Sequence, residues 1–361
     1  MITGSHNPKN YNGFKIVIND SPVSGIEIHN LISNELSNFK NLGSEIVRED
    51  IMDEYINEVI SQASSDTNAM KIVMDCGNGS ASEIAPKLIR SLGHQVIELF
   101  CKIDGNFPNH HPDPGKIENL KDLIKAVKSE SADVGIAFDG DGDRLGVVSN
   151  SGEIIYPDQL MMIFSKEVLK NNPGKEIVFD VKCTNLLNKI ITDAGGIPFM
   201  SPTGHFHIKN MLKKTKSPLA GEMSGHIFFN DKWYGFDDAH YAAFRLIEIL
   251  KNSKTSLDNL IKDLPKAFST PEMNINVDEN KKFQIVEDFI SKADFGTADK
   301  ITIDGLRVNF EDGWGLLRAS NTTPKLVLRF EANSSKRLNE IENMFLTQLK
   351  KIDETINIEL S

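Results

Sequence analysis

Two kinds of hydrophobic pattern alternate along the chain and indicate where strands and helices lie. Short apolar runs typical of buried strands occupy residues 71–75 (KIVMD) and 176–180 (EIVFD). Each run is followed by a loop, a stretch of helical period, a glycine and a second apolar run, which lies in residues 92–99 (LGHQVIEL) or 194–200 (AGGIPFM). Each copy predicts strand, helix and strand in this order. The repeat therefore indicates two α/β domains.

The pattern differs at the two ends of the chain. Residues 12–19 (NGFKIVIN) predict a strand and residues 25–39 an amphipathic helix, a piece too small to bury a core of its own. Toward the other end, helical patterns at 282–293 and 335–352 flank four short apolar runs, which predicts an α+β domain with an antiparallel sheet. These changes predict boundaries that divide the chain into residues 1–50, 51–153, 154–265 and 266–361.

The composition narrows the classes of protein to which the chain can belong. Hydrophobic residues make up 40% and charged residues 25% of its 361 positions, as is usual in soluble globular proteins. The net charge of −11 argues against broad nucleic-acid binding, but it allows an anionic small molecule held by a local group of cations. No apolar run is long enough to span a membrane, and no signal-peptide pattern opens the chain. The three cysteines lie far apart in the sequence, so we expect reduced thiols and a cytoplasmic protein. From the charge and the apolar pattern we expect neither nucleic-acid nor membrane partners.

An acidic loop carries the clearest chemical signal. A buried apolar run is followed by Asp139, Asp141 and Asp143, with glycines between them (DGDGDR). Alternate side chains of an extended segment point the same way, and the glycines between the aspartates let the backbone bend, so the three carboxylates are expected to converge. Because such carboxylates repel one another unless a cation lies between them, the loop predicts a site for Mg²⁺ or Ca²⁺; the alternative is a solvated acidic turn. We expect Arg144 to orient the loop or to contact an anionic ligand.

Two further loops gather groups that suit a sugar phosphate. In AGEMSGHIFF, Glu222, Ser224 and His226 alternate, so one extended face would offer an acceptor, a hydroxyl and an imidazole to sugar hydroxyl groups. In LLRASNTTPKLVLRF, a guanidinium, hydroxyls, an amide and turn N–H groups lie between two strands, as a phosphate site requires. The alternatives are an ordinary glycine-rich turn and a polar hairpin turn. The second loop contains Arg318, Ser320, Asn321, Thr322 and Thr323.

Ser5 and His6 lie in a turn close to the start of the chain, within MITGSHNPKNYNGFK. A glycine and a proline flank the pair, and these residues favour turns because of their unusual backbone angles. The pair alone leaves two alternatives, a nucleophilic serine or an ordinary loop residue. His110 and His111 lie in a proline-rich loop with no third ligand at a useful spacing, so we expect a structural role for them.

Four motifs stand in the same order as in the α-D-phosphohexomutases. TGSHNP, DGDGDR, GEMSGH and RASNTTP are spread over essentially the whole chain, and together they are specific although each alone is short. By these motifs the chain resembles the bacterial phosphomannomutase/phosphoglucomutase branch of that family. The resemblance implies two α/β domains with mixed sheets and a C-terminal α+β domain, preceded by the remnant of a first α/β domain.

The resemblance also implies an activity. Ser5 would be a phosphoserine that exchanges its phosphoryl group with a 1-phosphate or 6-phosphate of mannose or glucose, through a hexose 1,6-bisphosphate that turns over within the site. Mg²⁺ would be held by the three aspartates of the acidic loop and by the phosphate on Ser5. His6 and Lys15 would exchange protons beside the serine, and Arg144 would contact the transferring group. The substrate would be bound by Lys182, His205, Glu222, Ser224, His226, Arg318, Ser320, Asn321 and Thr322.

One departure from the family concerns the first domain, because family members carry a longer segment before the serine loop. We expect residues 1–50 to be the tail of a first domain, with a mobile serine loop and little activity in this chain alone. Family members are expected to be monomers, whereas apolar faces near residues 14–33 predict self-association here. Two alternatives to a mutase are a non-catalytic sugar-phosphate-binding fragment and a metal-dependent phosphatase, although the usual strand-end nucleophilic aspartate is absent.

Overall fold

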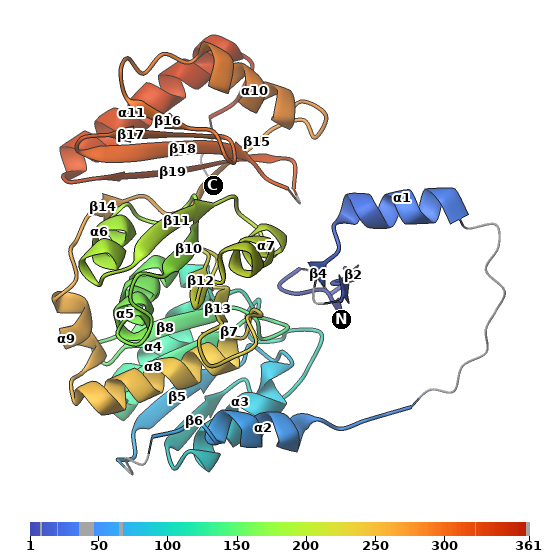
Figure 1. Cartoon of the computed structure of the whole chain (residues 1–361), viewed down its shortest axis with the longest axis vertical. Coiled ribbons are helices and arrows are strands. Elements are labelled where there is room, and N and C mark those ends of the chain that lie inside the picture. Colours follow the sequence, from blue (N-terminus) through green and yellow to red (C-terminus); the bar gives the residue numbers. More distant parts are fainter. Residues whose placement is uncertain (8, 20, 36–46, 65–67, 322, 359–361) are drawn as a thin grey trace.

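Three large β-sheets follow one another along the long axis of the molecule (Figure 1). A five-stranded sheet lies at one end, a four-stranded sheet in the middle and a six-stranded sheet at the other end, and the N-terminal segment contributes two two-stranded sheets. No helix in the described part of the chain is both long and apolar enough to cross a membrane. The computed structural model describes residues 1–358 except 8, 20, 36–46, 65–67 and 322.

The five-stranded sheet mixes parallel and antiparallel pairs. Its strands are β5 (Lys71–Asp75), β6 (Gln95–Leu99), β7 (Val134–Phe138), β8 (Leu145–Ser149) and β9 (Ile154–Ile155), in the order β6-β5-β7-β8-β9. β5 is parallel to β6 and β7, whereas β8 is antiparallel to β7 and β9. All five residues of β7 are buried, as expected for a strand covered on both faces. The helices of this unit are α2 (Met52–Ile60), α3 (Ala81–Ser91) and α4 (Lys121–Glu130), preceded by a 3₁₀ turn at Ile117–Leu120.

The four-stranded sheet repeats the first four strands of this arrangement. Its strands are β10 (Glu176–Asp180), β11 (Ile197–Ser201), β12 (Leu219–Gly221) and β13 (Ile227–Phe229), in the order β11-β10-β12-β13. β10 is parallel to β11 and β12, and β13 is antiparallel to β12. The strand–helix–strand repeat predicted from the sequence is therefore confirmed. The helices of this unit are α5 (Pro157–Leu169), α6 (Leu186–Asp193), α7 (His205–Thr215), α8 (Ala239–Ser253) and α9 (Leu257–Lys262).

One continuous hydrophobic core joins these two sheets. Helix α8 is apolar on most of its surface because it packs against α3, against β8 of the first sheet and against β13 of the second. Ile136 of the first sheet and Phe229 of the second belong to the same buried cluster, together with Tyr241 of α8. Smaller clusters cover the opposite faces, under α4 on one sheet and under α7 on the other. The two sheets are thus held together by shared apolar packing.

The six-stranded sheet is antiparallel, as predicted for the C-terminal region. Its strands are β14 (Phe268–Ser269), β15 (Met273–Asn276), β16 (Asp299–Ile301), β17 (Leu306–Phe310), β18 (Gly313–Ala319) and β19 (Lys325–Ala332). Helices α10 (Lys282–Lys292) and α11 (Ser335–Ile352) cover one face of this sheet. Phe289, Phe330 and Phe345 lie in a separate hydrophobic core between the helices and the sheet.

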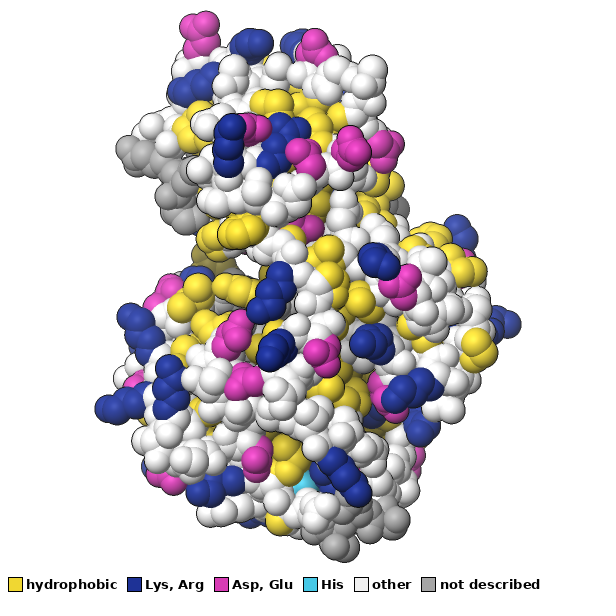
Figure 2. Space-filling view, turned by 90° about the vertical axis from the view of Figure 1, so that its left-hand side faces the viewer, with side chains coloured by type: hydrophobic (Ala, Val, Ile, Leu, Met, Phe, Trp, Pro, Cys, Tyr) yellow, Lys and Arg dark blue, Asp and Glu magenta, His cyan; other side chains and the backbone are white. Residues whose placement is uncertain are grey.

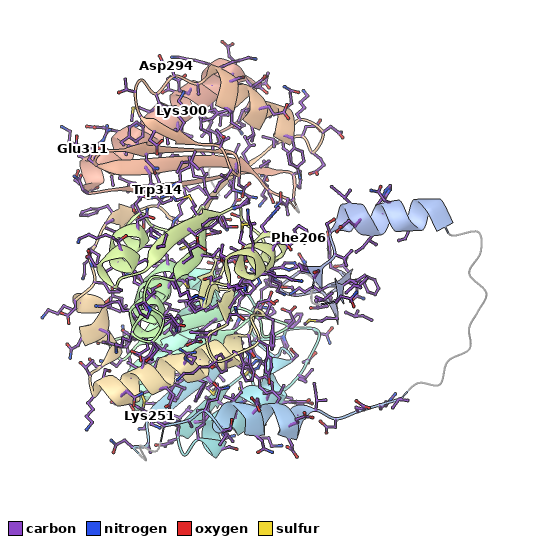
Figure 3. The ribbon with its side chains drawn as sticks, viewed as in Figure 1. Phe206, Lys251, Asp294, Lys300, Glu311 and Trp314 are labelled. Atoms are coloured by element: carbon purple, nitrogen blue, oxygen red, sulfur yellow. The ribbon has the colours of Figure 1, made fainter. Side chains whose placement is uncertain are left out.

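Two buried arginines connect the open face of this sheet to the middle sheet. Arg307 donates a hydrogen bond to the carbonyl oxygen of Cys183 over 2.9 Å, and its guanidinium carbon lies 3.7 Å from the ring centroid of Trp314. Arg329 donates to Asp158 Oδ2 over 3.1 Å. Trp314 lies on the side of the sheet that faces the middle of the molecule (Figure 3). The molecule narrows where the six-stranded sheet and its helices meet the part that contains the other two large sheets (Figure 2). Charges of both signs are interspersed over the face shown there.

The N-terminal segment forms two small antiparallel pairs, β1 (Ile2–Thr3) with β2 (Gly13–Phe14) and β3 (Val17–Ile18) with β4 (Ser21–Pro22). The prediction of a single strand over residues 12–19 is wrong, because its two halves pair with different segments, and Lys15 and Ile16 between them belong to neither strand. Helix α1 (Gly25–Glu35) stands apart from the rest of the molecule (Figure 1), and residues 36–39 of the predicted helix lie outside the described residues.

Candidate active site

The acidic loop (residues 139–143) and the sugar loop (residues 222–226) are equivalent turns of the two related sheets. The acidic loop joins β7 to β8, and the sugar loop joins β12 to β13. They lie side by side, because Leu145 N donates to Gly225 O over 3.1 Å and Arg144 forms a β-bridge with His226. Gly225 has a φ of 99°, a backbone conformation that favours glycine. The repeat therefore brings two chemically different loops to the same place.

Both loops are turns, so the acidic loop bends as its glycines were expected to allow, whereas the extended face predicted for the sugar loop is wrong. In the acidic loop, Asp139 Oδ1 accepts hydrogen bonds from the N–H groups of Asp143 and Arg144, over 3.0 and 3.1 Å. In the sugar loop, Glu222 N donates to His226 O over 2.9 Å. The acidic side chains converge because the loop curls around the carboxylate of Asp139, a local side-chain-to-backbone arrangement common in aspartate turns.

The three aspartates of the acidic loop form a compact group of oxygen atoms. Asp139, Asp141 and Asp143 each offer one carboxylate oxygen, and these oxygens lie within 4.8 Å of one another. Burial and the charges of the other two aspartates raise the pKa of Asp139 well above its ordinary value. Asp141 Oδ1 is buried and has no hydrogen-bond partner in the described part of the chain. Three convergent, largely buried carboxylates suit a hard divalent cation.

Lys15 shows that this group attracts positive charge. Its Nζ atom lies 3.3 Å from Asp141 Oδ2 and forms a closer ion pair with Asp143 Oδ2. Burial lowers the pKa of Lys15, but the charges of Asp143 and Asp141 outweigh this and raise it above its ordinary value. Burial likewise raises the pKa of Asp143, but the charges of His226 and Lys15 outweigh it and hold that pKa well below its usual range. Lys15 and Asp143 are therefore a charged pair at this site.

Ser5 lies at the acidic loop although 134 positions separate it from Asp139. Ser5 Oγ donates a hydrogen bond to Asp139 Oδ2 over 3.3 Å and lies 3.0 Å from His6 Nδ1. Thr3 Oγ1 accepts from Ser5 N and donates to Asp141 Oδ2, both over 2.8 Å, so this threonine joins the two loops. Gly140 is required here, because a Cβ atom at this position would lie 2.3 Å from Ser5 O. The serine hydroxyl is thus held beside the carboxylates.

His6 and Arg144 lie next to the serine. Burial and the charge of Arg144 lower the pKa of His6 to about 4, so its imidazole is neutral near pH 7. Arg144 Nε also lies 3.3 Å from His226 Nε2. His111 hydrogen-bonds the carbonyl oxygen of His6, and His110 Nε2 lies 3.0 Å from Asp75 Oδ2. These two contacts agree with the structural role expected for His110 and His111.

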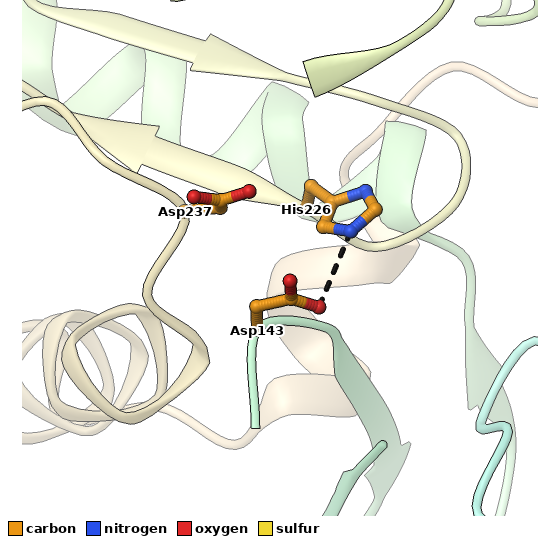
Figure 4. Close-up of side chains that lie close together, drawn as sticks. All are labelled: Asp143, His226 and Asp237. Carbon is orange, nitrogen blue, oxygen red and sulfur yellow. Dashed lines mark ion pairs between the residues drawn. The ribbon is translucent and has the colours of Figure 1, made fainter. Parts of the chain in front are cut away.

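The predicted sugar-binding residues of the sugar loop form one chain of contacts. His226 Nδ1 lies 2.8 Å from Ser224 Oγ and 3.1 Å from Glu222 Oε2, and its Nε2 lies 3.2 Å from Asp143 Oδ1 (Figure 4). Burial lowers the pKa of His226, but the charge of Asp143 and the hydrogen bonds of both carboxylates raise it to about 10. Burial raises the pKa of Glu222, but its hydrogen bond with His226 lowers it to about 2. The sugar loop therefore carries a negative charge on Glu222 and a positive charge on His226.

The predicted phosphate clamp lies at the end of β18 and in the loop that follows. Arg318 is buried, its Nε donates to Asp304 Oδ2 over 2.9 Å, and its Nη2 has no hydrogen-bond partner among the residues that the structure describes. Ser320 Oγ accepts from Thr323 Oγ1 over 2.8 Å, and Asn321 is exposed. Thr322, a fourth member of the predicted clamp, lies outside the described residues. The described part of the clamp thus offers one buried guanidinium beside a polar turn.

Lys182 and His205 lie between the sugar loop and the clamp. Lys182 Nζ pairs with Glu272 over 2.9 Å. Burial lowers the pKa of Lys182, but the charges of Glu272 and Asp180 outweigh this and raise it above its ordinary value. His205 begins α7, where burial lowers its pKa below the ordinary value. The adjacent Gly204 N donates to Glu222 Oε1 over 2.6 Å. These residues link the clamp to the sugar loop.

The sequence did not reveal which carboxylates pair with Arg318 and Lys182, two of the predicted substrate-binding side chains. Asp304 accepts hydrogen bonds from Arg318 Nε and Thr203 N, and Glu272 pairs with Lys182. Asp304 precedes a glycine in IDGLR and Glu272 lies in STPEM, two stretches that are typical of turns. Their partners lie far away along the chain, so no spacing in the sequence could have found them.

Comparison with known proteins agrees with this arrangement. Models of phosphoglucomutase/phosphomannomutase α/β/α domain II, α/β/α domain III and the C-terminal domain match residues 53–152, 156–268 and 272–348. The chain is 51% identical over 359 residues to a phosphomannomutase/phosphoglucomutase of Pseudomonas putida, covering 99% of this chain and 77% of that protein. The chain belongs to the phosphoglucomutase/phosphomannomutase family.

Other members of the phosphoglucomutase/phosphomannomutase family are similar over almost all of the chain. A phosphoglucomutase of Neisseria meningitidis is 49% identical over 350 residues, which are 96% of this chain and 76% of that protein. The crystal structure of a phosphoglucomutase/phosphomannomutase family protein from Burkholderia thailandensis has a TM-score of 0.92 and 45% identity, covering 99% of this chain and 76% of that one. The fold class predicted from the sequence is confirmed. The chain is a hexose phosphate mutase with an acidic cluster that can hold a divalent metal ion.

Proposed function

We propose that Ser5 carries the phosphoryl group that this mutase transfers between the two ends of a hexose. The bond from phosphorus to Ser5 Oγ breaks as a new bond forms to a sugar hydroxyl, which gives a hexose 1,6-bisphosphate. The other phosphoryl group then returns to Ser5. The contacts of Ser5 with Asp139 and His6 support this role, because phosphoryl transfer depends mainly on position and charge stabilisation.

Mg²⁺ is the cation that we propose for the acidic loop. Asp139, Asp141 and Asp143 would hold it, together with an oxygen of the phosphoryl group on Ser5. Buried oxygen ligands without nitrogen or sulfur favour this ion. When bound, it would neutralise charge on the transferring group.

His6 is the better placed of the two groups proposed for proton exchange. Its Nδ1 lies 3.0 Å from Ser5 Oγ, so it can accept the serine proton when Ser5 attacks the bisphosphate and return that proton to the serine oxygen when Ser5 is the leaving group. Lys15 is engaged by the acidic loop and would instead stabilise negative charge. Arg144, beside His6, would contact the transferring phosphoryl group.

The remaining residues are proposed to hold the sugar and its second phosphate. Glu222, Ser224 and His226 would bind sugar hydroxyl groups. Arg318, Ser320, Asn321 and Thr322 would bind the phosphate that does not react, with Lys182 and His205 between the two groups. A clamp that recognises phosphate alone accepts either end of the sugar, which a bisphosphate that turns around requires. The names of the relatives support mannose phosphates, glucose phosphates or both as the substrates.

We also propose the organisation that the sequence predicted. Residues 1–50, 51–153, 154–265 and 266–361 would be four units that contribute the serine, the acidic loop, the sugar loop and the clamp. The protein would act in the cytoplasm and would self-associate through its N-terminal segment. A non-catalytic sugar-phosphate-binding fragment is the alternative to full activity.

The observation that carries the proposal is the contact of Ser5 with the acidic loop across the sequence. The test incubates the purified chain with glucose 1-phosphate, a trace of glucose 1,6-bisphosphate and Mg²⁺, and measures glucose 6-phosphate. Ser5→Ala should abolish turnover, and Ser61→Ala on the surface of α2 is the control. Binding without turnover in the parent chain would support the fragment instead, and release of inorganic phosphate would support a phosphatase.

A further inference from the structure

Two of the three cysteines are in direct contact although 25 positions of the sequence separate them. Cys76 directly follows β5, and Cys101 lies just after β6, the strand that pairs in parallel with β5. Their Sγ atoms are 3.0 Å apart, and both thiols are free. We propose that this pair is an oxidation site, at which hydrogen peroxide converts the two thiols into a reversible disulfide.

The backbone at the ends of the two strands holds the thiols together. Cys76 N donates a hydrogen bond to Leu99 O over 3.1 Å, so the pairing of the strands continues beyond β5. Phe100 has a φ of 53°, which is uncommon for a residue other than glycine, and its carbonyl oxygen accepts from Asn78 N over 2.8 Å. The chain therefore bends directly before Cys101. The folded protein thus keeps the two sulfur atoms close without a bond between them.

The two cysteines differ in their access to an oxidant. Cys101 is partly exposed, whereas Cys76 is completely buried. The hydrogen bond with Cys101, together with burial, raises the pKa of the Cys76 thiol well above its ordinary value. Peroxides react with accessible thiolates, so Cys101 is the thiol that they oxidise first. Cys76 is then the second thiol, which closes the disulfide.

The reaction proceeds in two steps. In the first step, Cys101 Sγ forms a bond to one oxygen of the peroxide, the O–O bond breaks, and the departing hydroxide leaves with the thiol proton as water. The sulfur atom has lost two electrons and is a sulfenic acid. In the second step, Cys76 Sγ forms a bond to Cys101 Sγ, the S–O bond breaks, and hydroxide leaves with the proton of Cys76 as water. Two thiols and one hydrogen peroxide thus give one disulfide and two water molecules.

The turn that follows Cys76 supports the acidic loop. Gly79 N donates to Cys76 O over 2.8 Å, and Ser80 N donates to Gly140 O over 3.0 Å. A Cβ atom at Gly79 would lie 2.7 Å from Gly140 O, so the two backbones are in contact. Bond formation draws Cys76 toward Cys101 and shifts this turn. The effect on activity rests on the proposed function: an error of about 1 Å in a reacting geometry can cost about a hundredfold in rate, so oxidation should slow the mutase.

The test treats the reduced, purified chain with hydrogen peroxide, blocks the remaining thiols and identifies the linked peptides by mass spectrometry. The parent chain should contain a Cys76–Cys101 disulfide that dithiothreitol reverses. Cys76→Ser should instead accumulate a sulfenic acid at Cys101, which the probe dimedone captures, and Cys101→Ser should give neither product. Cys183→Ser is the matched control, because it changes a buried thiol that donates to Asp180 Oδ1, and it should form the disulfide as the parent does.

An oxidised parent chain without the Cys76–Cys101 disulfide would overturn the proposal, and so would a disulfide that joins two chains. Mutase activity is the second readout. The oxidised parent should lose at least about tenfold in rate and recover it on reduction, whereas Cys101→Ser should keep its rate in peroxide. Complete disulfide formation without loss of rate would refute the connection to the acidic loop. Absence of turnover in the reduced chain would contradict the proposed function alone, because the mass measurement decides on the disulfide independently.

Discussion

Arg318 and Asp304 form a buried ion pair whose Nε–Oδ2 distance is 2.9 Å, and the same carboxylate oxygen accepts a hydrogen bond from Thr203 N over 2.9 Å. One oxygen therefore ties the predicted phosphate clamp of the C-terminal sheet to the loop before α7. The Nη2 group of Arg318 remains without a hydrogen-bond partner among the described residues. The arginine is thus held by one edge and can offer the other to a phosphate.

The first prediction concerns this arginine. Arg318→Ala should weaken binding of hexose 1-phosphate and hexose 6-phosphate alike, by about 1.5–3 kcal/mol, the usual contribution of a hydrogen bond to a charged group. Arg318→Lys keeps the positive charge but removes the planar guanidinium group with its several N–H donors. Its sugar-phosphate affinity should therefore fall less than that of Arg318→Ala. Calorimetric titration of both isomers provides the measurement. Loss of affinity for one isomer alone would show that the clamp reads the sugar and not only its phosphate.

The second prediction concerns Glu272, which pairs with the buried Lys182 over 2.9 Å. Glu272→Gln leaves that ammonium without its counter-charge, so an arriving phosphate no longer competes with a carboxylate. We expect sugar-phosphate affinity to rise on the order of tenfold, which corresponds to about 1.4 kcal/mol. Glu279→Gln, which removes an exposed acid elsewhere in the C-terminal unit, is the control. Weaker binding in Glu272→Gln would mean that the carboxylate supports the ligand.

The third prediction concerns the acidic loop. Asp141→Asn removes one charge from three convergent carboxylates while keeping the shape of the side chain. We expect Mg²⁺ affinity and mutase activity to fall together, with an unchanged circular dichroism spectrum. Calorimetry of Mg²⁺ binding is the decisive measurement, and unaltered affinity would rule out the loop as the metal site.

The fourth prediction concerns the junction of the C-terminal sheet. Arg307→Met removes hydrogen bonds to the carbonyl oxygens of Val181 and Cys183 and leaves both buried. Each hydrogen bond to a charged donor contributes about 1.5–3 kcal/mol. The free energy of unfolding, measured with denaturant, should therefore fall by at least this amount. Arg337→Met on α11 removes an exposed ion pair and should change stability by less than about 1 kcal/mol. Equal effects of the two substitutions would contradict a special role for the junction.

Much of the fold could be predicted because its signals are local. The apolar runs at 71–75 and 176–180 become the central parallel strands β5 and β10, since a strand covered on both faces must be apolar throughout. The single strand predicted over residues 12–19 is not formed, because this segment is not covered on both faces. Its apolar residues are exposed in two-residue pairs, and no wider sheet of the described structure takes them up.

The site could be predicted in its residue types but not in its geometry. The aspartates of the acidic loop were recognisable as candidate metal ligands in a segment that its glycines allow to bend, but the hydrogen bonds that close the turn around Asp139 could not be predicted. The equivalence of the acidic and sugar loops was hidden, because the repeat is visible in strands and not in the turns that differ. Asp237 escaped notice because its partners, Lys209 and His226, come together only through the fold.

The fifth prediction concerns self-association through the N-terminal segment. Ile2, Phe14 and Ile26 are 70%, 70% and 75% exposed, and α1 stands apart from the rest of the molecule (Figure 1). Large apolar side chains exposed to this degree favour association in water. Sedimentation velocity should therefore show a mass that rises with concentration. The triple substitution to serine at these positions should abolish the rise, whereas Ile197→Ser and Ile303→Ser, exposed elsewhere, should not. A constant monomer mass for the parent chain over the whole concentration range would refute association through this surface.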